Sequence, residues 1–369
     1  MPAFDVSPLG RLIFGVGALS QVGSLAVAFG RRPLLITDAG LVHTGQPARA
    51  LKLLQDAGLD VAVFDKVEPN PTETVVRAGV AVAHSHRADL LIALGGGSAM
   101  DCAKGVNFLA TNGGSMADYR GHDKATKPML PSLGIPTTTG TGSEAQSYAL
   151  ITDASTHQKM ACGDKKAAFR VALLDPELTL SQPRSVAAVT GIDAISHAVE
   201  SFVSLKANPY SRMCALEAWK HLEPNFERCL THPDDIEAKA AMQLGAYFAG
   251  MSIEASMLGA THSCANPLTA HYGLTHGVAI GLMLPHVVLY NSPTVEHQYR
   301  LLATGGEELA ARCRQFAERA GLPACLRDCG VSRSILPLLA HEANQQWTAR
   351  FNPRPVDEVS LLQLYERAW

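Results

Sequence analysis

Short apolar runs alternate with helix-length segments through the first half of this 369-residue chain. The apolar runs are bounded by Gly, Pro or Asp and cover residues 33–38, 60–67, 89–97, 133–139 and 170–176. Helical segments such as 46–57 and 72–85 lie between the early runs. Because strands that alternate with helices form a parallel sheet covered on both faces, the pattern predicts an α/β domain over residues 1–182.

The second half has a different character. After about residue 180, Ala, Leu, Glu and His recur at helical spacing, and Pro183 marks a joint at which a preceding element would end. Residues 183–369 are therefore expected to form an all-helical domain. With 47% hydrophobic residues, the chain can give each of the two domains its own core.

Charge and cysteine usage exclude several classes of partner. The net charge is −3 and no long run of like charges occurs, so we expect neither a nucleic-acid nor a membrane partner. Eight cysteines without a CxxC pair indicate reduced thiols and a cytoplasmic protein. Residues 12–30 are uncharged, but four glycines interrupt them, which favours a short strand, a turn and a small helix over a membrane span.

A glycine-rich loop follows the apolar run at 89–97. The sequence LIALGGGSAMDCAKG passes from a strand through Gly95, Gly96 and Gly97 to Ser98 and a helix. Glycines let the backbone approach a phosphate, and a helix start offers N–H groups and the positive end of its dipole. A tight strand-to-helix turn without a ligand would use the same residues. No GxGxxG follows the first strand, so this is not the ordinary dinucleotide fingerprint.

Two other strand ends carry polar side chains. IPTTTGTGSEAQ, residues 135–146, places Thr137, Thr138 and Thr141 among glycines, where hydroxyl and N–H groups can surround a nucleotide or cap a helix. Asp38 ends the run PLLITD. A carboxylate there can accept hydrogen bonds from ribose hydroxyls and repel a 2′-phosphate, which favours NAD over NADP, or it can cap the next helix. Similar loops at several strand ends favour a ligand crevice.

The segment GIDAISHAVES, residues 191–201, contains a possible pair of metal ligands within an apolar helix. Asp193 and His197 are four residues apart, so they project from one helical face. They could share a ligand, or the aspartate could simply be the hydrogen-bond partner of the imidazole.

Two more histidines complete a possible ligand set. His262 and His276 are separated by a proline and a glycine, a spacing that permits a helix, a turn and a return. One carboxylate and three imidazoles suit Fe²⁺ or Zn²⁺ and leave a position open for a substrate oxygen. His271 and His286 offer a rival set.

The order of these motifs resembles the iron-containing (group III) alcohol dehydrogenase family over nearly the whole chain. The matching stretches are FGVGAL near the start, VEPNPT at 67–72, GGGSAMDCAK at 95–104, IPTTTGTGSE at 135–144, LLDPELT at 173–179, GIDAISHAVES, residues 262–276, LPHVVLYN at 284–291 and NPRPV at 352–356. The resemblance implies an α/β dinucleotide-binding domain with a parallel sheet and an all-α metal-binding domain, the dehydroquinate synthase-like fold, in a homodimer.

The resemblance also implies an activity and its cofactors. It implies hydride transfer between nicotinamide C4 and a small alcohol or aldehyde held at a metal, with NAD rather than NADP and with Fe²⁺, Zn²⁺ being the alternative metal. The metal ligands it implies are Asp193, His197, His262 and His276. The nucleotide contacts it implies are Asp38, Asn70, Gly96, Gly97, Ser98, Asp101, Thr137, Thr138 and Thr141.

One position departs from the family pattern. Relatives often carry a further histidine four residues after the first ligand of the 262–276 segment, where this chain has Asn266. An amide can form hydrogen bonds but does not titrate near neutral pH, which puts a proton relay through this position in doubt. His271 is nearby and could substitute, although its offset of five residues from Asn266 places it off that helical face. The predicted catalytic set is His262, His276, Asn266 and His271.

Other functions share parts of this pattern. A glycerol dehydrogenase or a maleylacetate reductase-like oxidoreductase is an alternative within the family, and dehydroquinate synthase-like proteins pair NAD with a metal in a redox-neutral reaction. A catalytically silent nucleotide-binding protein is the alternative from another class, and Asn266 is its best support.

Overall fold

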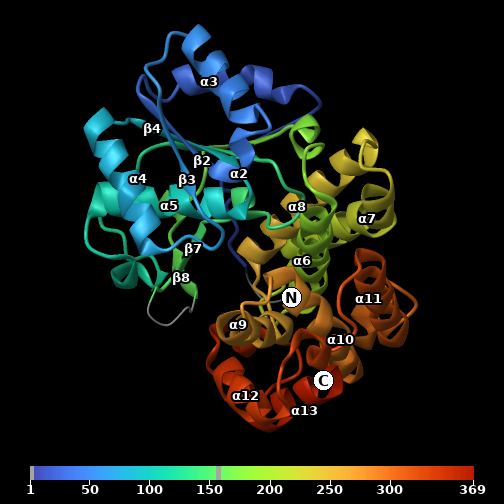
Figure 1. The fold of residues 1–369 in the computed structure, drawn as a ribbon. Coiled ribbons are helices and arrows are strands. Elements are labelled where there is room, and N and C mark those ends of the chain that lie inside the picture. Colours follow the sequence, from blue (N-terminus) through green and yellow to red (C-terminus); the bar gives the residue numbers. More distant parts are fainter. Residues whose placement is uncertain (1–3, 155–158) are drawn as a thin grey trace. The chain divides into compact units, whose positions relative to one another are not determined.

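The computed structural model describes residues 4–154 and 159–369, which divide into two compact units. The α/β unit consists of Ser7–Thr138 and Gly142–Gln182. The helical unit consists of Pro183–Trp369 together with residues 4–6 and Thr139–Thr141. Figure 1 shows strands and helices in the first unit and helices in the second.

A parallel sheet forms the centre of the α/β unit. In the described ranges, its six strands lie in the order β1-β9-β6-β4-β2-β3, and every pair is parallel. Their bounds are β1 Arg11–Phe14, β2 Pro33–Asp38, β3 Ala62–Val67, β4 Leu90–Gly95, β6 Ser132–Pro136 and β9 Val171–Leu174. The predicted strands are thus confirmed. Three end earlier than predicted, at Gly95, Pro136 and Leu174, because glycine and threonine residues leave the sheet as loops after the first two and Asp175 caps a 3₁₀ helix after the third.

Helices cover both faces of this sheet. They are α1 Val22–Val27, α2 Ala39–Val42, α3 Gln46–Asp56, α4 Glu73–His86 and α5 Gly97–Asn112. Successive side chains of a strand point to opposite faces. Accordingly, Leu34 and Ile36 of β2 share one hydrophobic cluster with Val106 of α5, whereas Leu35 shares another with Leu54 of α3. Burying each of these side chains stabilises the unit by about 2 kcal/mol.

Shorter elements complete the α/β unit. β5 Gly121–His122, β8 Lys159–Gly163 and β7 Tyr148–Thr152 form a small second sheet in which β7 and β8 are antiparallel. The 3₁₀ helices are η1 Ala18–Gln21, η2 Met116–Tyr119, η3 Ser143–Ala145, η4 Lys165–Ala167 and η5 Pro176–Thr179. The uncharged stretch 12–30 forms the predicted strand, turn and small helix.

The helical unit is built from long helices, as predicted. They are α6 Arg184–Val203, α7 Pro209–Thr231, α8 Ile236–Ala255, α9 Ala260–Tyr272, α10 His276–Tyr299, α11 Gly306–Ala320, α12 Leu336–Gln345 and α13 Glu358–Ala368, with 3₁₀ turns η6 Leu326–Cys329, η7 Arg333–Ile335 and η8 Trp347–Phe351. Pro183 is the N-cap of α6. All eight cysteines lie in the described ranges and are free thiols.

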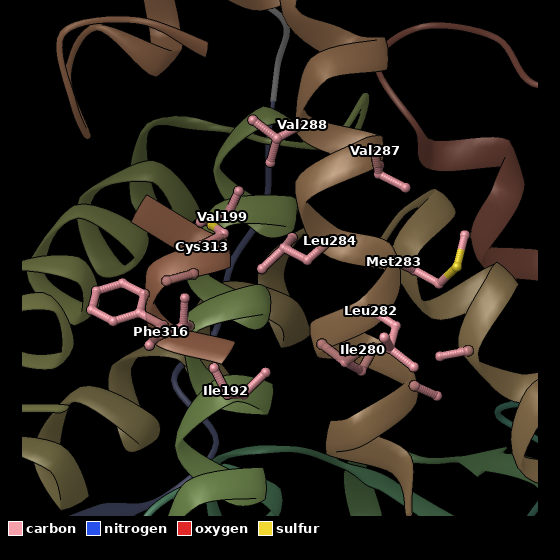
Figure 2. Packing of buried hydrophobic residues seen from close by; sticks show 14 of the residues in the cluster. Ile192, Val199, Ile280, Leu282, Met283, Leu284, Val287, Val288, Cys313 and Phe316 are labelled. Carbon is pink, nitrogen blue, oxygen red and sulfur yellow. The ribbon is translucent and has the colours of Figure 1, made fainter. Parts of the chain in front are cut away.

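Helices α6, α10 and α11 pack their apolar side chains together. Figure 2 shows Ile192 and Val199 of α6 beside Leu284 of α10 and Phe316 of α11. Within the described residues, α6 and α10 are long and apolar enough to cross a membrane, but 83% and 61% of their most apolar windows are buried inside the protein. Such burial is what core helices of a globular domain show. The polar residues of α6 therefore need a specific reason to be there.

Candidate active site

Helix α6 buries a carboxylate and an imidazole on one face. Asp193 and His197 are 7% and 5% exposed, and Asp193 Oδ1 lies 3.3 Å from His197 Nε2. The i, i+4 spacing on a regular helix produces this proximity, as the sequence predicted. Apolar residues of the same helix pack into the core, so the position of the pair is set by the helix rather than by a flexible loop.

Helices α9 and α10 bring two further imidazoles to the same place. His262 lies in the first turn of α9, and His276 is the first residue of α10. Between them, α9 ends at Gly273, whose φ of +62° suits a residue without Cβ. The predicted helix, turn and return is confirmed.

The imidazole nitrogens converge on one oxygen. Asp193 Oδ1 lies 3.3, 3.5 and 3.7 Å from Nε2 of His197, His262 and His276. Donor atoms held about 2.1 Å from a tetrahedral metal are about 3.4 Å apart, so these separations suit ligands around an ion. Within the described residues, Asp193, His262 and His276 also form a group whose ligand atoms all lie within 4.8 Å of one another.

Two atoms of this cluster, one on Asp193 and one on His262, lack a hydrogen-bond partner in the part of the chain that the structure describes. Asp193 Oδ1 and His262 Nε2 are fully buried and have no hydrogen-bond partner among the described residues. A buried polar atom without a partner costs about 1–3 kcal/mol, and a cation would satisfy both atoms at once. Carboxylate and imidazole donors are those that Fe²⁺ and Zn²⁺ prefer. The residues present therefore fit a divalent transition metal.

Glu200 orients one of these imidazoles. Its Oε2 is 2.6 Å from His262 Nδ1, and its Oε1 accepts a hydrogen bond of 2.7 Å from the backbone N–H of Thr261. Nδ1 therefore carries the proton toward Glu200, and Nε2 faces Asp193. Burial alone would raise the pKa of Glu200, but the hydrogen bond and charge of His262 together with the hydrogen bonds from Thr261 outweigh burial and lower that pKa.

The carboxylates and imidazoles of the cluster shift one another's pKa values. Burial opposes the charge on Asp193, but the neighbouring imidazoles, His197 first, hold its pKa well below the usual range. Burial lowers the pKa of His262, while its contacts with Asp193 and Glu200 raise it to a net value of about 9. Without a metal, a proton thus stabilises the two carboxylates. A cation at the cluster would take over that role.

Asn266 and His271 lie farther along α9. Asn266 is one turn after His262, and its Nδ2 donates a hydrogen bond of 3.1 Å to Oε1 of Gln346. His271 Nε2 lies 2.9 Å from Oε2 of Glu342 on α12. His271, which the sequence analysis placed in the catalytic set, is paired with Glu342 and does not join the cluster around Asp193, because its offset of five residues from Asn266 turns it to another face of α9.

The α/β unit gathers its polar loops at the carboxyl edge of the sheet. The connection after β2 leads toward β3, whereas the connection after β4 leads toward β6, so the direction of the strand order reverses between β2 and β4. Open parallel sheets bind ligands at such a switch point. Asp38 ends β2 and Gly95 ends β4. A Cβ on Gly95 would lie 2.9 Å from Asp38 Oδ2, so the two strand ends lie next to each other at this switch point.

The glycine loop leads directly into α5. Gly96 is its N-cap and Gly97 its first residue, so the helix N–H groups that lack helical acceptors are at the loop. A Cβ on Gly96 would lie 3.2 Å from Thr138 Cγ2, which brings the threonine loop alongside. Asn70, with φ of +53°, donates its backbone N–H to Ser98 Oγ at 3.2 Å. The loops after β3, β4 and β6 therefore lie next to one another.

Asp38 caps α2, the alternative that its position had left open. Its Oδ1 accepts a hydrogen bond of 2.9 Å from the N–H of Leu41. Burial raises the pKa of Asp38, and the backbone hydrogen bonds that it accepts partly oppose this shift. The cap fixes the carboxylate at the strand end, so capping and ribose binding are compatible roles.

A buried polar network ties α5 to the turn after the threonine loop. Lys104 Nζ donates to Ser143 O, Ser143 Oγ and Tyr148 O at 2.7, 2.8 and 2.8 Å, and Ser143 Oγ donates to Asp101 Oδ1 at 2.7 Å. Burial raises the pKa of Asp101, and Lys104 partly opposes this shift. Thr141, in contrast, falls in the short segment grouped with the helical unit.

Residues 10–176 match the family model for iron-containing alcohol dehydrogenase, and residues 187–369 match the C-terminal model of the same family. The chain belongs to the iron-containing alcohol dehydrogenase family. The resemblance drawn from the motifs is thereby confirmed, as is the fold class. The roles of the individual site residues stay predictions.

Characterised members of the family are similar to this chain over nearly their whole length. The NAD-dependent methanol dehydrogenase of Bacillus methanolicus is 34% identical over 370 residues, which cover 96% of this chain and 97% of that protein. The lactaldehyde reductase of Escherichia coli is 34% identical over 376 residues, with coverages of 96% and 97%. A crystal structure of 1,3-propanediol oxidoreductase has a TM-score of 0.96 and 32% identity, and all of both chains is covered.

Sequence reasoning missed Glu200 and Lys104, although both lie within motifs that it had singled out. Glu200 follows Asp193 by seven residues, two helical turns along the same face of α6. That spacing was the available signal. Lys104 closes GGGSAMDCAK and is 1% exposed, and a lysine in an otherwise buried helical stretch was the corresponding signal there.

Proposed function

We propose that this iron-containing alcohol dehydrogenase family member is a metal-dependent, NAD(H)-linked alcohol dehydrogenase or aldehyde reductase. The observation that carries the proposal is the convergence of three imidazole nitrogens on Asp193 Oδ1 within a buried cluster. The NAD dependence of the methanol dehydrogenase relative and the reductase activity named for another relative support the reaction class.

Asp193, His197, His262 and His276 would hold the metal, which is Fe²⁺ by family and for which Zn²⁺ is the alternative. When bound, a divalent metal supplies Lewis acidity toward an alcohol or carbonyl oxygen. Glu200 accepts the Nδ1 proton of His262 and so keeps Nε2 directed at the cluster, where a cation would replace the second proton of the metal-free ring. The rigid helices α6, α9 and α10 hold the donors in place.

The carboxyl edge of the sheet would bind the nucleotide. Gly96, Gly97 and Ser98 present the start of α5 to the pyrophosphate, whose negative charge the helix dipole favours. The carboxylate of Asp38 would accept hydrogen bonds from the ribose hydroxyls and disfavour a 2′-phosphate, so NAD is preferred to NADP. Thr137 and Thr138 would line the neighbouring side of the crevice, and Asn70, Asp101 and Thr141 complete the proposed contacts.

Asn266 gives this chain a neutral amide one turn beyond a metal ligand. It can donate to or accept from a substrate hydroxyl, but it cannot move a proton near neutral pH. Asn266 lies one helical turn beyond His262, whereas His271 lies off that face of α9, so of these two residues Asn266 is the better placed to contact a substrate.

We also propose the wider setting of the enzyme. The α/β unit, within residues 1–182, would be the NAD-binding domain, and residues 183–369 would be the metal-binding domain. The protein would act in the cytoplasm as a homodimer on a small alcohol or aldehyde. The relatives act on methanol, lactaldehyde and 1,3-propanediol, according to their names, so the family leaves the choice of substrate open.

The test is NADH oxidation by the Fe²⁺-loaded protein with a panel of short aldehydes and hydroxyaldehydes, beside a chelator-treated sample. Metal-dependent oxidation with at least one aldehyde is the expected result. Stoichiometric NADH binding without oxidation of NADH across the panel would contradict the proposal and favour a silent nucleotide-binding protein.

A further inference from the structure

Two motifs of the helical unit remain without a role in the site described above. LPHVVLYN ends at Asn291 on α10, and NPRPV begins at Asn352 just after η8. Both asparagines are almost fully buried, at 2% and 1% exposed. Buried asparagine is costly unless its amide is hydrogen-bonded, so their partners identify what they do.

The two side chains bind each other. Asn291 Nδ2 donates to Asn352 Oδ1 at 3.1 Å, and Asn352 Nδ2 donates to Asn291 Oδ1 at 2.7 Å. Asn352 Nδ2 also donates to Arg354 O at 2.6 Å, and Asn352 Oδ1 also accepts the N–H of Ala260 at 3.2 Å. Both donors and both acceptor sites of the Asn352 amide are therefore used. Such a fully satisfied group has a single orientation.

Ala260 is the first residue of α9, the helix that carries His262. The N-cap of α9 is Gly259, which has no side chain to accept the first N–H groups. Side chains from elsewhere in the unit accept these hydrogen bonds instead. Asn352 accepts one from Ala260 N–H, and Glu200 accepts one from Thr261 N–H. A Cβ on Gly259 would lie 2.9 Å from Asn352 Oδ1 and 3.1 Å from Glu200 Oε1. The helix start thus fits tightly between these two side chains.

Arg354 anchors the loop that carries Asn352. Its Nη1 donates to Tyr290 O at 2.8 Å, and its guanidinium lies 4.1 Å from the centre of the Tyr290 ring. Tyr290 in turn donates its hydroxyl to Pro355 O at 2.6 Å. Because Tyr290 precedes Asn291 on α10, the two motifs form one anchored unit against the start of α9.

We propose that the Asn291–Asn352 amide pair is a positioning device for the metal centre. It fixes the first turn of α9 and thereby directs Nε2 of His262 toward Asp193, while Glu200 fixes the rotation of the ring. The proposal rests on the proposed metal site and adds to it the function of LPHVVLYN and NPRPV. Losing a residue that orients a ligand typically weakens metal binding about 10–100-fold. Asn352 acts on the helix that carries the ligand, so loss of its amide should weaken metal binding by about tenfold, the lower end of that range.

The experiment titrates Co²⁺ into the metal-depleted full chain and follows the visible absorption of the bound ion. Asn352→Ala should weaken Co²⁺ binding about tenfold and change the absorption spectrum, because the ligand geometry changes. Asn208→Ala is the matched control, since Asn208 is also buried in the helical unit but its side chain forms hydrogen bonds with Ser211 N–H and Ala255 O rather than with a residue of α9. Its Co²⁺ affinity and spectrum should match those of the unaltered chain.

Gly259→Ala tests the same inference if Asn352→Ala does not fold. Its added methyl group displaces the asparagine and Glu200 without removing either, and it should also weaken Co²⁺ binding and shift the spectrum. Unchanged affinity and spectrum in the folded Asn352 or Gly259 variant, or equal losses in Asn208→Ala, would overturn the positioning role. Failure of the unaltered chain to bind Co²⁺ would overturn both this role and the proposed metal site.

Discussion

Glu200 and His262 are joined by a hydrogen bond of 2.6 Å between Oε2 and Nδ1, and this contact determines which ring nitrogen faces Asp193. A neutral imidazole can carry its proton on either nitrogen. The carboxylate of Glu200 also accepts a hydrogen bond from Thr261 N–H. It places the ring proton on Nδ1, so the lone pair of Nε2 is left to bind a cation. A residue of α6 thus prepares a ligand on α9.

Glu200→Gln should weaken metal binding about tenfold or more while the helical unit stays folded. The amide can still meet the ring, but it lacks the charge that favours the required tautomer and ring position. Bound metal is measured by competition with a chelator and by elemental analysis. Glu217→Gln, which changes a half-buried carboxylate on α7 that contacts His221, serves as the control and should bind metal normally. Equal retention in both variants would contradict the role of Glu200.

Asp38→Asn should relax the preference for NADH over NADPH about tenfold, because it removes a negative charge that would face the 2′-phosphate. Asparagine is as good an N-cap as aspartate, so α2 should keep its start and the α/β unit its stability. The measurement is kcat/KM with each cofactor. Asp65→Asn, on the exposed side of β3, is the control. A preference that is unchanged by Asp38→Asn would remove Asp38 from the ribose site.

Gly95→Ala should lower the free energy of unfolding by about 1–3 kcal/mol and weaken NADH binding. The new methyl group would lie 2.7 Å from Ala99 Cβ and 2.9 Å from Asp38 Oδ2, which forces α5 and β2 apart at the crevice. Gly113→Ala controls for backbone strain, since Gly113 has φ of +76° but no atom near its Cβ position. Equal NADH affinity in the two variants would show that the crevice does not bind the nucleotide.

Glu144 should make the stability of the α/β unit depend on pH. Burial raises its pKa from 4.5 to about 7, so the folded chain holds this proton more tightly than the unfolded chain. The resulting stability is fully present below pH 4.5 and is lost as the pH rises through about 7. Between about pH 5 and pH 8, the loss should reach up to about 3 kcal/mol.

Glu144→Gln does not titrate and should lack this loss. Urea unfolding of both proteins at several pH values measures the difference. If the urea concentration at the unfolding midpoint falls equally in both proteins as the pH rises, the pH dependence belongs to another group.

The sequence predicted the elements of the site better than their mutual contacts. Alternating apolar runs located β2, β4 and β6, and their ends located the glycine and threonine loops, because both follow from local chemistry. The small sheet of β5, β8 and β7 was not predicted, since its pairs join segments whose short strands carry little periodic signal.

The same limit explains what was missed around the metal cluster. Asp193 and His197 could be paired from their spacing because one helix carries both. The contact between Glu200 and His262 spans 62 residues, and that between Asn291 and Asn352 spans 61. Such contacts depend on how α6, α9 and α10 pack, which periodicity does not determine. The motifs marked these residues, but the structure was needed to give them partners.

The measurement that tests the central claim most directly is the metal content and NADH oxidation rate of His262→Ala, determined on the same sample as the unaltered enzyme. His262 provides the buried Nε2 that lacks a hydrogen-bond partner among the described residues, so its loss should remove metal and turnover together while circular dichroism reports an intact fold. Undiminished turnover in a His262→Ala protein that contains no metal would contradict the account.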